Sequence, residues 1–332
     1  MARTKSKTLS LVVPCFNEAD VLPEFLARVR NVAQGLRGWQ CEFLFVDDGS
    51  QDATPDLLTQ EAAKDPRVRV IRLSRNFGHQ RAISAGTDFC TGDAIIITDA
   101  DLQDPPELIP DILRKLEGHD IVHMVRSDRR VDGLLKRTMA HVFYRVMRRW
   151  VLPELPENAG DFKGFNRRVL VVLRAHRERV RFMRGAFATM GFRQTELRYV
   201  RAARHAGRSK YPLRSTLRLA RDAVFSNSAL PMRPGIYAGA FTLAASCLTA
   251  AGVSLYAATG GAVASPLLIA LLLALLGACG MILMLLGFAG EYLKILLLEV
   301  KQRPLYIIRE TCNVDVAARA ASESSPEELL RT

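Results

Sequence analysis

Two carboxylates separated by one residue, Asp99 and Asp101, follow directly on the apolar segment 94–97. Residues two apart at the end of a strand point to the same side, and open α/β sheets bind ligands beyond the carboxyl ends of their strands. A hard cation such as Mg²⁺ takes one or two protein carboxylates and completes its shell with water and substrate phosphates. The pair therefore predicts a metal-diphosphate site, with a solvated strand-to-loop turn as the alternative interpretation.

Strands alternate with helices in the first part of the chain, which is the pattern of a parallel sheet. The expected strands are 9–13, 42–46, 68–73, 94–98 and 120–125, and the expected helices are 21–29, 52–63, 80–87 and 106–116. Three of these strands end in acidic or polar residues, at 17–18, 47–48 and 99–101. Because the carboxyl ends of parallel strands meet at one edge, these residues should share one rim and form a nucleotide and metal site.

Two segments without a charged residue, 236–259 and 265–290, each exceed the ~20 residues that cross a bilayer. They predict a two-helix transmembrane hairpin, and a pair of buried core helices is the alternative. Basic residues flank both outer ends, whereas the connecting loop has none, so both termini should be cytoplasmic. The apolar segment 11–13 is too short for the core of a signal peptide.

The remaining segments complete a division of the chain into five parts. These are a cytosolic α/β domain at 1–212, an interfacial amphipathic helix at 213–233, the hairpin at 236–290, a cytosolic helix (291–300) and strand (305–308) within 291–315, and a disordered tail at 316–332. Within the first part, residues 134–152 are predicted to form a basic amphipathic helix with Trp150 on its apolar face. Such a helix lies in the membrane interface or packs on the α/β domain.

Composition limits the partners. The formal net charge of +12 favours anionic lipid headgroups or phosphorylated substrates, and no recognisable nucleic-acid module is present. The six cysteines show no metal-ligand spacing and are expected to be reduced.

Five motifs in order carry a resemblance to a known family. They are VPCFNE at 13–18, DDGSQDAT at 47–54, RNFG at 75–78, DADLQDPPE at 99–107 and GRSKY at 207–211. From about residue 9 to 310 the chain resembles the family 2 inverting glycosyltransferases, and more narrowly the dolichyl-phosphate mannose synthase and bactoprenol glucosyltransferase group. The resemblance implies a GT-A type, Rossmann-like, mostly parallel sheet domain followed by a two-helix transmembrane hairpin.

The resemblance also implies roles for individual residues. The donor nucleotide would be bound by Pro14, Phe16, Glu18, Asp48 and Ala100. Mg²⁺ or Mn²⁺ would be bound by Asp99, Asp101 and Gln103. Phosphates of the acceptor lipid and the donor would be bound by Arg126, Lys136, Arg204, Ser209 and Lys210, with Arg137 as an alternative to Lys136. Asp161 would join Asp99 and Asp101 as a catalytic carboxylate that orients the sugar or the acceptor, with a general-base role as the alternative. His79 is expected to be a packing or loop residue, with contact to substrate as the alternative.

The implied reaction is transfer of one sugar, with inversion, from a nucleotide-sugar to polyprenyl (undecaprenyl) phosphate at the cytoplasmic face of the inner membrane. UDP-glucose is the favoured donor and GDP-mannose the alternative. Thr189-Met190 and Lys163-Gly164-Phe165 depart from the family pattern near the sugar, which leaves the donor open. A processive polysaccharide synthase and a non-catalytic nucleotide-sugar-binding scaffold are the competing classes. A homotetramer and a separate downstream flippase are further expectations from the resemblance.

Overall fold

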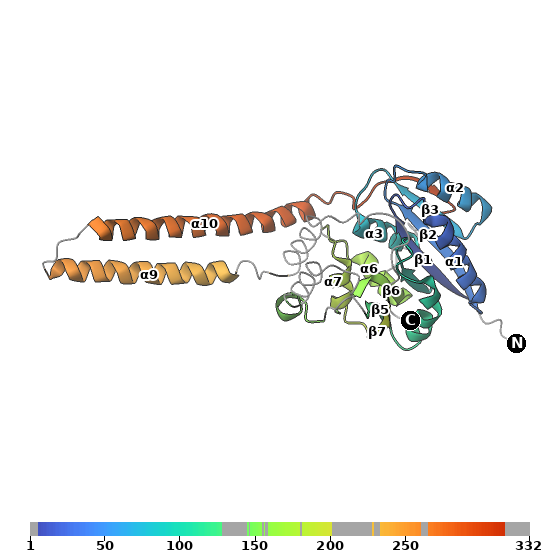
Figure 1. Ribbon diagram of the computed structural model, residues 1–332, viewed down its shortest axis with the longest axis horizontal. Coiled ribbons are helices and arrows are strands. Elements are labelled where there is room, and N and C mark those ends of the chain that lie inside the picture. Colours follow the sequence, from blue (N-terminus) through green and yellow to red (C-terminus); the bar gives the residue numbers. More distant parts are fainter. Residues whose placement is uncertain are drawn as a thin grey trace. The chain divides into compact units, whose positions relative to one another are not determined.

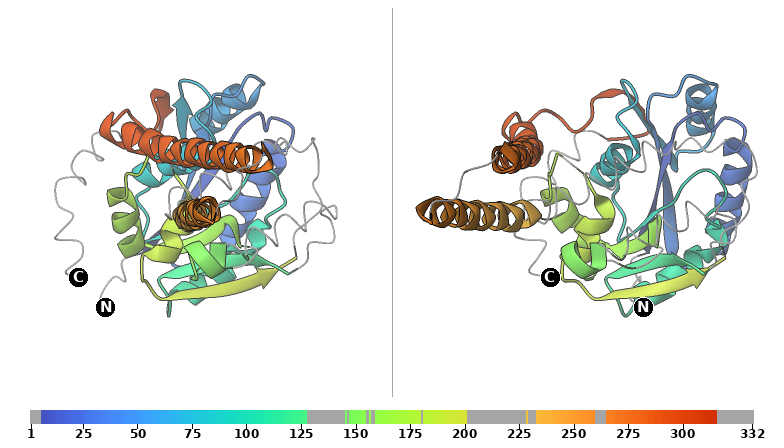
Figure 2. Two further views of the ribbon diagram at one scale, coloured as in Figure 1. Left: turned by 90° about the vertical axis from the view of Figure 1, so that its left-hand side faces the viewer. Right: turned by 60° about the vertical axis from the view of Figure 1, so that its left-hand side comes forward.

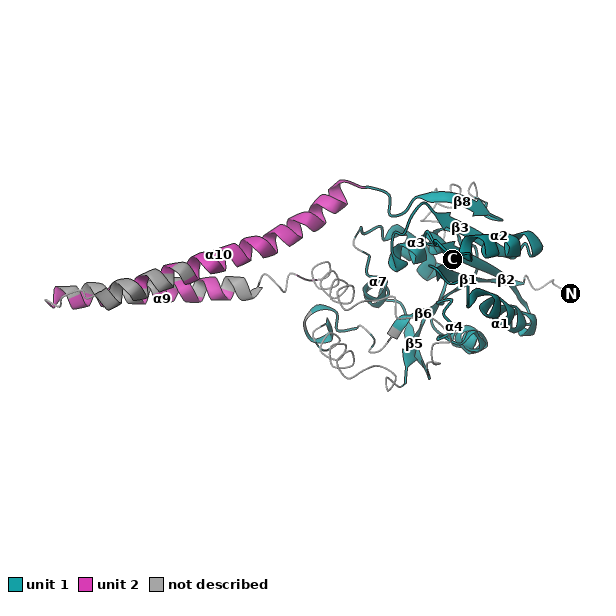
Figure 3. Cartoon of the chain, turned by 45° about the horizontal axis from the view of Figure 1, so that its top comes forward, with its two compact units in different colours: residues 1–212, 303–332 teal, residues 213–302 magenta. Residues whose placement is uncertain are grey.

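The computed structural model describes residues 6–127, 145, 147–154, 156, 159–179, 181–200, 228, 233–259 and 265–315. The chain forms two compact units, which Figure 3 colours separately. One unit comprises Met1–Pro212 and Arg303–Thr332, and the other comprises Leu213–Gln302. The first unit is therefore built from both ends of the chain.

A mixed sheet forms the centre of the first unit (Figure 1). Its described strands lie in the order β7-β5-β6-β4-β1-β2-β3-β8. Their bounds are β1 Lys7–Cys15, β2 Trp39–Asp47, β3 Val68–Leu73, β4 Ala94–Ile97, β5 Ile121–Arg126, β6 Ala159–Asn166, β7 Gln194–Tyr199 and β8 Ile308–Cys312. The predicted strands β1 to β4 pair in parallel, whereas β6 and β8 run antiparallel to their neighbours. The strand order reverses between β1 and β4, where open α/β sheets bind ligands.

Helices cover both faces of this sheet (Figure 2). The helices are α1 Leu22–Gly35, α2 Thr54–Lys64, α3 His79–Phe89, α4 Ile109–Leu116 after the 3₁₀ turn η1 Pro106–Leu108, α6 Arg167–Ala175 and α7 Met183–Thr189. Along β2, Phe43 and Phe45 pack with α1, α2 and α4, whereas Leu44 and Val46 pack with α3. Because successive side chains of a strand point to opposite faces, a strand covered on both faces is apolar throughout.

The sequence did not predict two strands and two helices of this unit, which are β6, β7, α6 and α7. Gly160 and Gly164 interrupt β6, and the charged residues Asp161 and Lys163 lie between them, so this strand has no apolar signal. The strand expected at 305–308 is also shifted, because β8 begins only at Ile308. Leu305 and Tyr306 are instead buried side chains of the core on the α3 face.

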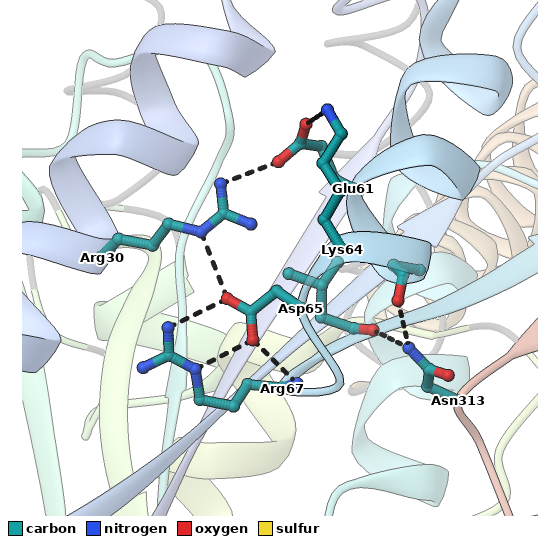
Figure 4. Close-up of polar contacts among 8 residues, drawn as sticks. Arg30, Glu61, Lys64, Asp65, Arg67 and Asn313 are labelled. Carbon is teal, nitrogen blue, oxygen red and sulfur yellow. Dashed lines mark hydrogen bonds and ion pairs between the residues drawn. The ribbon is translucent and has the colours of Figure 1, made fainter.

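The segment after α10 fastens the C-terminal part of the chain to the sheet. β8 pairs antiparallel with β3, and so covers an edge that would otherwise present unpaired backbone groups. Beyond β8, the Asn313 side chain donates hydrogen bonds to the carbonyls of Ala62 (2.7 Å) and Val68 (2.9 Å), as Figure 4 shows. Arg30 of α1 pairs with Glu61 in the same region.

The second unit contains α9 (Arg233–Ala258) and α10 (Ser265–Val300), which are helical as expected. Among the described residues, one helical segment, Gly277–Val300, is long and apolar enough to cross a membrane, with a mean hydropathy of 1.9. This segment overlaps the span predicted at 265–290 and extends beyond its end. The other predicted span, 236–259, is not confirmed.

Several predicted segments fall wholly or partly outside the described residues. Of the helix expected at 134–152, the structure describes residue 145, a π-helical turn at Met147–Val151 and Leu152. Of the interfacial helix expected at 213–233, it describes residues 228 and 233. The tail at 316–332 lies outside the described residues.

A glycine after β2 allows two loops of the rim to touch. Gly49 has a φ of +70°, and a Cβ at this position would lie 2.4 Å from the carbonyl carbon of Arg75. The adjacent Asp48 carboxylate accepts hydrogen bonds from the amides of Phe77 (2.7 Å) and Gly78 (2.9 Å). The hydrogen bonds to Asp48 thus hold loop 75–78 against the end of β2, so close to Gly49 that a side chain at this position would clash with the loop.

Replacing Gly49 with alanine should lower the free energy of unfolding by about 2–4 kcal/mol, because strain from the positive φ adds to a backbone clash. Gly38→Ala is the matched control: Gly38 also has a positive φ, 81°, but a Cβ there meets nothing within 4 Å. Thermal unfolding should therefore show a smaller loss for the control. Equal losses in the two variants would mean that the contact with loop 75–78 is unimportant.

Candidate functional site

The pairing of β6 with β4 determines which acids face each other. Ile97 of β4 is the register partner of Lys163 of β6 in an antiparallel ladder. Continuing this register by two residues on each strand brings Asp99 opposite Asp161. The two carboxylates therefore meet at the rim formed by the carboxyl ends of β1, β2 and β4, where the sequence predicted that the acidic loops would converge.

His79, the first residue of α3, lies between these two carboxylates. Its Nε2 atom is 3.6 Å from Oδ1 of Asp99 and 3.4 Å from Oδ2 of Asp161. Burial alone would lower the pKa of His79, but the carboxylates of Asp99 and Asp161 raise it to about 9. His79 is therefore more than a packing or loop residue: its ring lies between two predicted catalytic acids, and the raised pKa favours its protonated form.

Asp161 is held by two further side chains that the sequence analysis missed. Arg184 of α7 donates to both carboxylate oxygens, Nε to Oδ1 (3.1 Å) and Nη2 to Oδ2 (3.2 Å). The side-chain amide of Gln80 also donates to Oδ2 of Asp161 (3.2 Å). The side-chain oxygen of Gln80 accepts a hydrogen bond from the backbone N–H of Met183. Burial would raise the pKa of Asp161, but Arg184 and His79 hold it well below its usual range. Asp161 is thus an oriented anion.

Asp99 has the opposite electrostatic environment. Burial and the nearby carboxylates of Asp104, Asp101 and Asp161 raise the pKa of Asp99 to about 6, although His79 opposes the shift. The Asp99 side chain retains 31% of its exposure, so it can be reached from solvent. This excess of negative charge favours binding of an added cation.

The donor set fits a divalent ion that keeps part of its shell for other ligands. No group of three or more His, Cys, Asp or Glu side chains in the described part of the chain has the arrangement of a metal centre. Asp99 and Asp101 supply hard carboxylate oxygens, as Mg²⁺ requires of only one or two protein ligands. Gln103 is half-buried, and its backbone N–H donates a hydrogen bond to Oδ1 of Asp101 (3.1 Å). Its role as a ligand stays a prediction.

The residues predicted to bind the nucleotide lie in two loops that are joined by hydrogen bonds. The amide of Asn17 donates to Ser50, and the amide of Glu18 donates to Thr54 (both 2.9 Å). Phe16 and Glu18 are half-buried on this rim, and Pro14, Asp48 and Ala100 are buried. The two hydrogen bonds that Asp48 accepts from loop 75–78 give it a structural role. Contact of these residues with a nucleotide stays a prediction.

Arg126, at the end of β5, lines a cleft of about 880 Å³. Other residues that line the cleft are Ser127, Arg148, Phe192 and Arg198. The predicted phosphate-binding residues Lys136, Arg204, Ser209 and Lys210 lie outside the described residues. The structure therefore places one residue of this predicted set, at a cleft that Glu154 and Glu196 line together with the three arginines.

Lys163 is a further buried cation near Asp161. It is 1% exposed, its ammonium has no hydrogen-bond partner among the described residues, and it lies 4.3 Å from the centre of the Phe187 ring. Burial lowers the pKa of Lys163 to about 8, against the attraction of Asp161. A lone lysine or arginine in an unrecognised strand or helix carries no sequence signal, so Lys163 and Arg184 could not be assigned beforehand.

His123 lies next to Lys163 in the β5–β6 ladder, and it is buried in the neutral form. Its Nε2 atom is 2.7 Å from Oε1 of Gln194, whose amide nitrogen donates to the carbonyl of Phe187. This orientation of Gln194 assigns the proton of His123 to Nε2. Burial, with repulsion from Lys163, lowers the pKa of His123 to about 4.

Comparison with known proteins gives a family and several full-length relatives. The model of glycosyl transferase family 2 matches residues 10–173. The chain is 38% identical over 306 residues to the SfII prophage-derived bactoprenol glucosyl transferase of Shigella flexneri, covering 91% of this chain and 98% of the relative. It is 37% identical over 312 residues to the uncharacterized glycosyltransferase YkcC of Bacillus subtilis, covering 92% and 94%. A solved structure of the mannosyltransferase PcManGT of Pyrobaculum calidifontis, in complex with GDP-Man and Mn²⁺, aligns with a TM-score of 0.43 and 19% identity, covering 87% and 88%.

Replacing His123 with glutamine should make stability less sensitive to acid. The unfolded chain protonates His123 near its ordinary pKa of 6.5 and the folded chain only near 4, so the wild type should lose stability as the pH falls through this window. The loss attributable to this group is about 3 kcal/mol. Thermal unfolding of detergent-solubilised protein between pH 7 and pH 4 should show a shallower decline for the variant. Parallel pH profiles would contradict the buried neutral state.

Proposed function

The chain belongs to glycosyl transferase family 2, and we propose that it transfers one sugar from a nucleotide-sugar to polyprenyl phosphate at the cytoplasmic face of the inner membrane. UDP-glucose is the favoured donor and undecaprenyl phosphate the favoured acceptor. The relative named for bactoprenol glucosyl transfer supports this proposal, because the similarity extends over 91% of this chain. GDP-mannose stays the alternative donor.

The observation that carries the proposal is the opposition of Asp99 and Asp161 across the rim. Asp99 lies among carboxylates that attract a cation, whereas Asp161 lies among cations. A divalent ion, Mg²⁺ or Mn²⁺, bound to Asp99, Asp101 and Gln103 would neutralise charge on the departing nucleoside diphosphate. The acidic side of the rim thus suits the donor diphosphate.

The transfer itself is a single displacement at the anomeric carbon. An oxygen of the lipid phosphate forms the new bond to this carbon as the bond to the nucleoside diphosphate breaks, so an α-linked donor gives a β-linked product. The second pKa of a phosphate monoester is near ~6, so this nucleophile is largely ionised at neutral pH. Asp161 is therefore needed to orient the sugar or the acceptor rather than to remove a proton.

Arg126 is proposed to bind the acceptor phosphate, together with Lys136, Arg204, Ser209 and Lys210, which would also bind donor phosphates. Guanidinium groups suit phosphate oxygens because they donate two hydrogen bonds in a fixed geometry. The proposed anchors are the apolar segment Gly277–Val300 and a second span at 236–259, with both termini cytoplasmic. A homotetramer and a downstream flippase remain parts of the proposal.

Incubating membranes that contain the protein with labelled nucleotide-sugars and undecaprenyl phosphate should yield a chloroform-soluble lipid that carries one sugar. A panel of UDP- and GDP-sugars identifies the donor. A long polymer would indicate a processive synthase, and absence of product with every donor would indicate a scaffold.

Removing the metal site should abolish this product. We expect Asp99→Asn and Asp101→Asn each to lower turnover by at least about 100-fold, because charge on the leaving group would no longer be neutralised. EDTA should have the same effect on the wild type, reversed by excess Mg²⁺ or Mn²⁺. Asp111→Asn is the control, since this exposed acid pairs only with its helical neighbour Arg114 among the contacts the structure describes. Unchanged turnover in the site variants would rule out the metal-dependent reaction.

Asp161→Asn should lower turnover by more than about tenfold, because Arg184 and His79 lose the anion that orients them. Asp120→Asn is the matched control. Asp120 is also buried, and it accepts hydrogen bonds from Asn166 (2.8 Å) and the amide of Arg193 (3.1 Å) away from the rim. Turnover that stays within tenfold in Asp161→Asn would remove Asp161 from the essential residues.

A further inference from the structure

The third aspartate of the acidic run, Asp104, has a partner of its own on β7. Asp104 is 1% exposed, and its carboxylate accepts a hydrogen bond from the hydroxyl of Tyr199 at the end of β7. Tyr199 is 5% exposed, and its ring packs edge-on against Phe162 with centroids 5.7 Å apart. Asp104 therefore joins the acidic run to the interior contacts of β7, in addition to its charge near Asp99.

Tyr199 in turn contacts Arg126. The two residues are register partners on the neighbouring parallel strands β5 and β7, so their side chains stand on the same face of the sheet. The Arg126 guanidinium is near the Tyr199 hydroxyl, and the Asp104 carboxylate raises the pKa of Arg126 against the effect of burial. Asp104, Tyr199 and Arg126 thus form a buried chain of contacts from the acidic run to the cleft.

The space around Arg126 is also restricted. A Cβ at Gly160 of β6 would lie 3.1 Å from Nη2 of Arg126, so the guanidinium packs closely against the Gly160 backbone. The Nε atom of Arg126 is buried and has no hydrogen-bond partner among the described residues. The Gly160 backbone thereby limits the conformations of the Arg126 side chain, which still lines the cleft.

We propose that Asp104 and Tyr199 are positioning residues that set the Arg126 guanidinium to bind the phosphate of the acceptor lipid. This inference rests on the proposed function. A guanidinium fixed before the ligand arrives loses less conformational freedom on binding, so affinity for the phosphate rises without a new contact to it. Arg148 and Arg198 line the same cleft and add positive charge, and Glu154 and Glu196 line it as well. The acidic run would then serve both substrates, with Asp99 and Asp101 on the donor side and Asp104 on the acceptor side.

The direct test is Tyr199→Phe, which removes the hydroxyl and keeps the ring against Phe162. We expect the KM for undecaprenyl phosphate to rise about tenfold, the effect of losing a hydrogen bond to a charged group, while the KM for the nucleotide-sugar changes less than twofold. Tyr306→Phe is the matched control. Tyr306 is also buried, and its hydroxyl donates to a buried carboxylate, Asp88 (2.6 Å), away from the cleft. Thermal unfolding of both variants measures any general loss of stability.

Asp104→Asn separates charge from hydrogen bonding, because asparagine still accepts from Tyr199 but no longer attracts Arg126. The acceptor KM should rise by a larger factor than the Mg²⁺ concentration for half-maximal turnover, to which Asp104 contributes only through its charge near Asp99. A shifted Mg²⁺ requirement with an unchanged acceptor KM would assign Asp104 to the metal and overturn the proposal. Equal acceptor KM values in Tyr199→Phe and Tyr306→Phe would also overturn it. Failure of the wild type to form any glycolipid is a different result, which rejects the proposed function itself.

Discussion

The antiparallel pairing of β6 with β4 is the constraint on which the candidate site depends. It inserts one reversed strand beside the parallel strands, so the beginning of β6 arrives at the rim where the other strands end. A side chain near the start of β6 can therefore face the loop that follows β4. Without this reversal, Asp161 would lie at the opposite edge of the sheet from Asp99.

Charge is divided across this rim. Carboxylates gather on the loop after β4, where burial and their mutual repulsion raise the pKa of Asp99. Cations gather around Asp161 from three different elements: His79 from α3, Lys163 from β6 and Arg184 from α7. A buried group of cations around one anion costs solvation energy that the fold must offset elsewhere, and such arrangements are typical of sites that bind charged ligands.

The sequence predicted the acidic half of this site but not the basic half. The acids follow apolar strands whose pattern is visible in the sequence, and the carboxyl ends of parallel strands converge by topology alone. The cations are single residues in segments whose pattern is weak, and only tertiary packing brings them to Asp161. The same reason explains the missing β6, in which Gly160, Asp161, Lys163 and Gly164 mask the strand. The contacts of His79 were not predicted because its partners are 20 and 82 residues away in the chain.

The position of β8 has a consequence for the order in which the protein is completed. This strand covers the edge of β3, yet it follows α10 in the chain, so it leaves the ribosome after the apolar helix. The β3 edge of a nascent chain therefore lacks its partner until the apolar helix has been synthesised. Closure of the sheet is then a late step of folding, which makes completion of the α/β unit depend on the synthesis of the helical one.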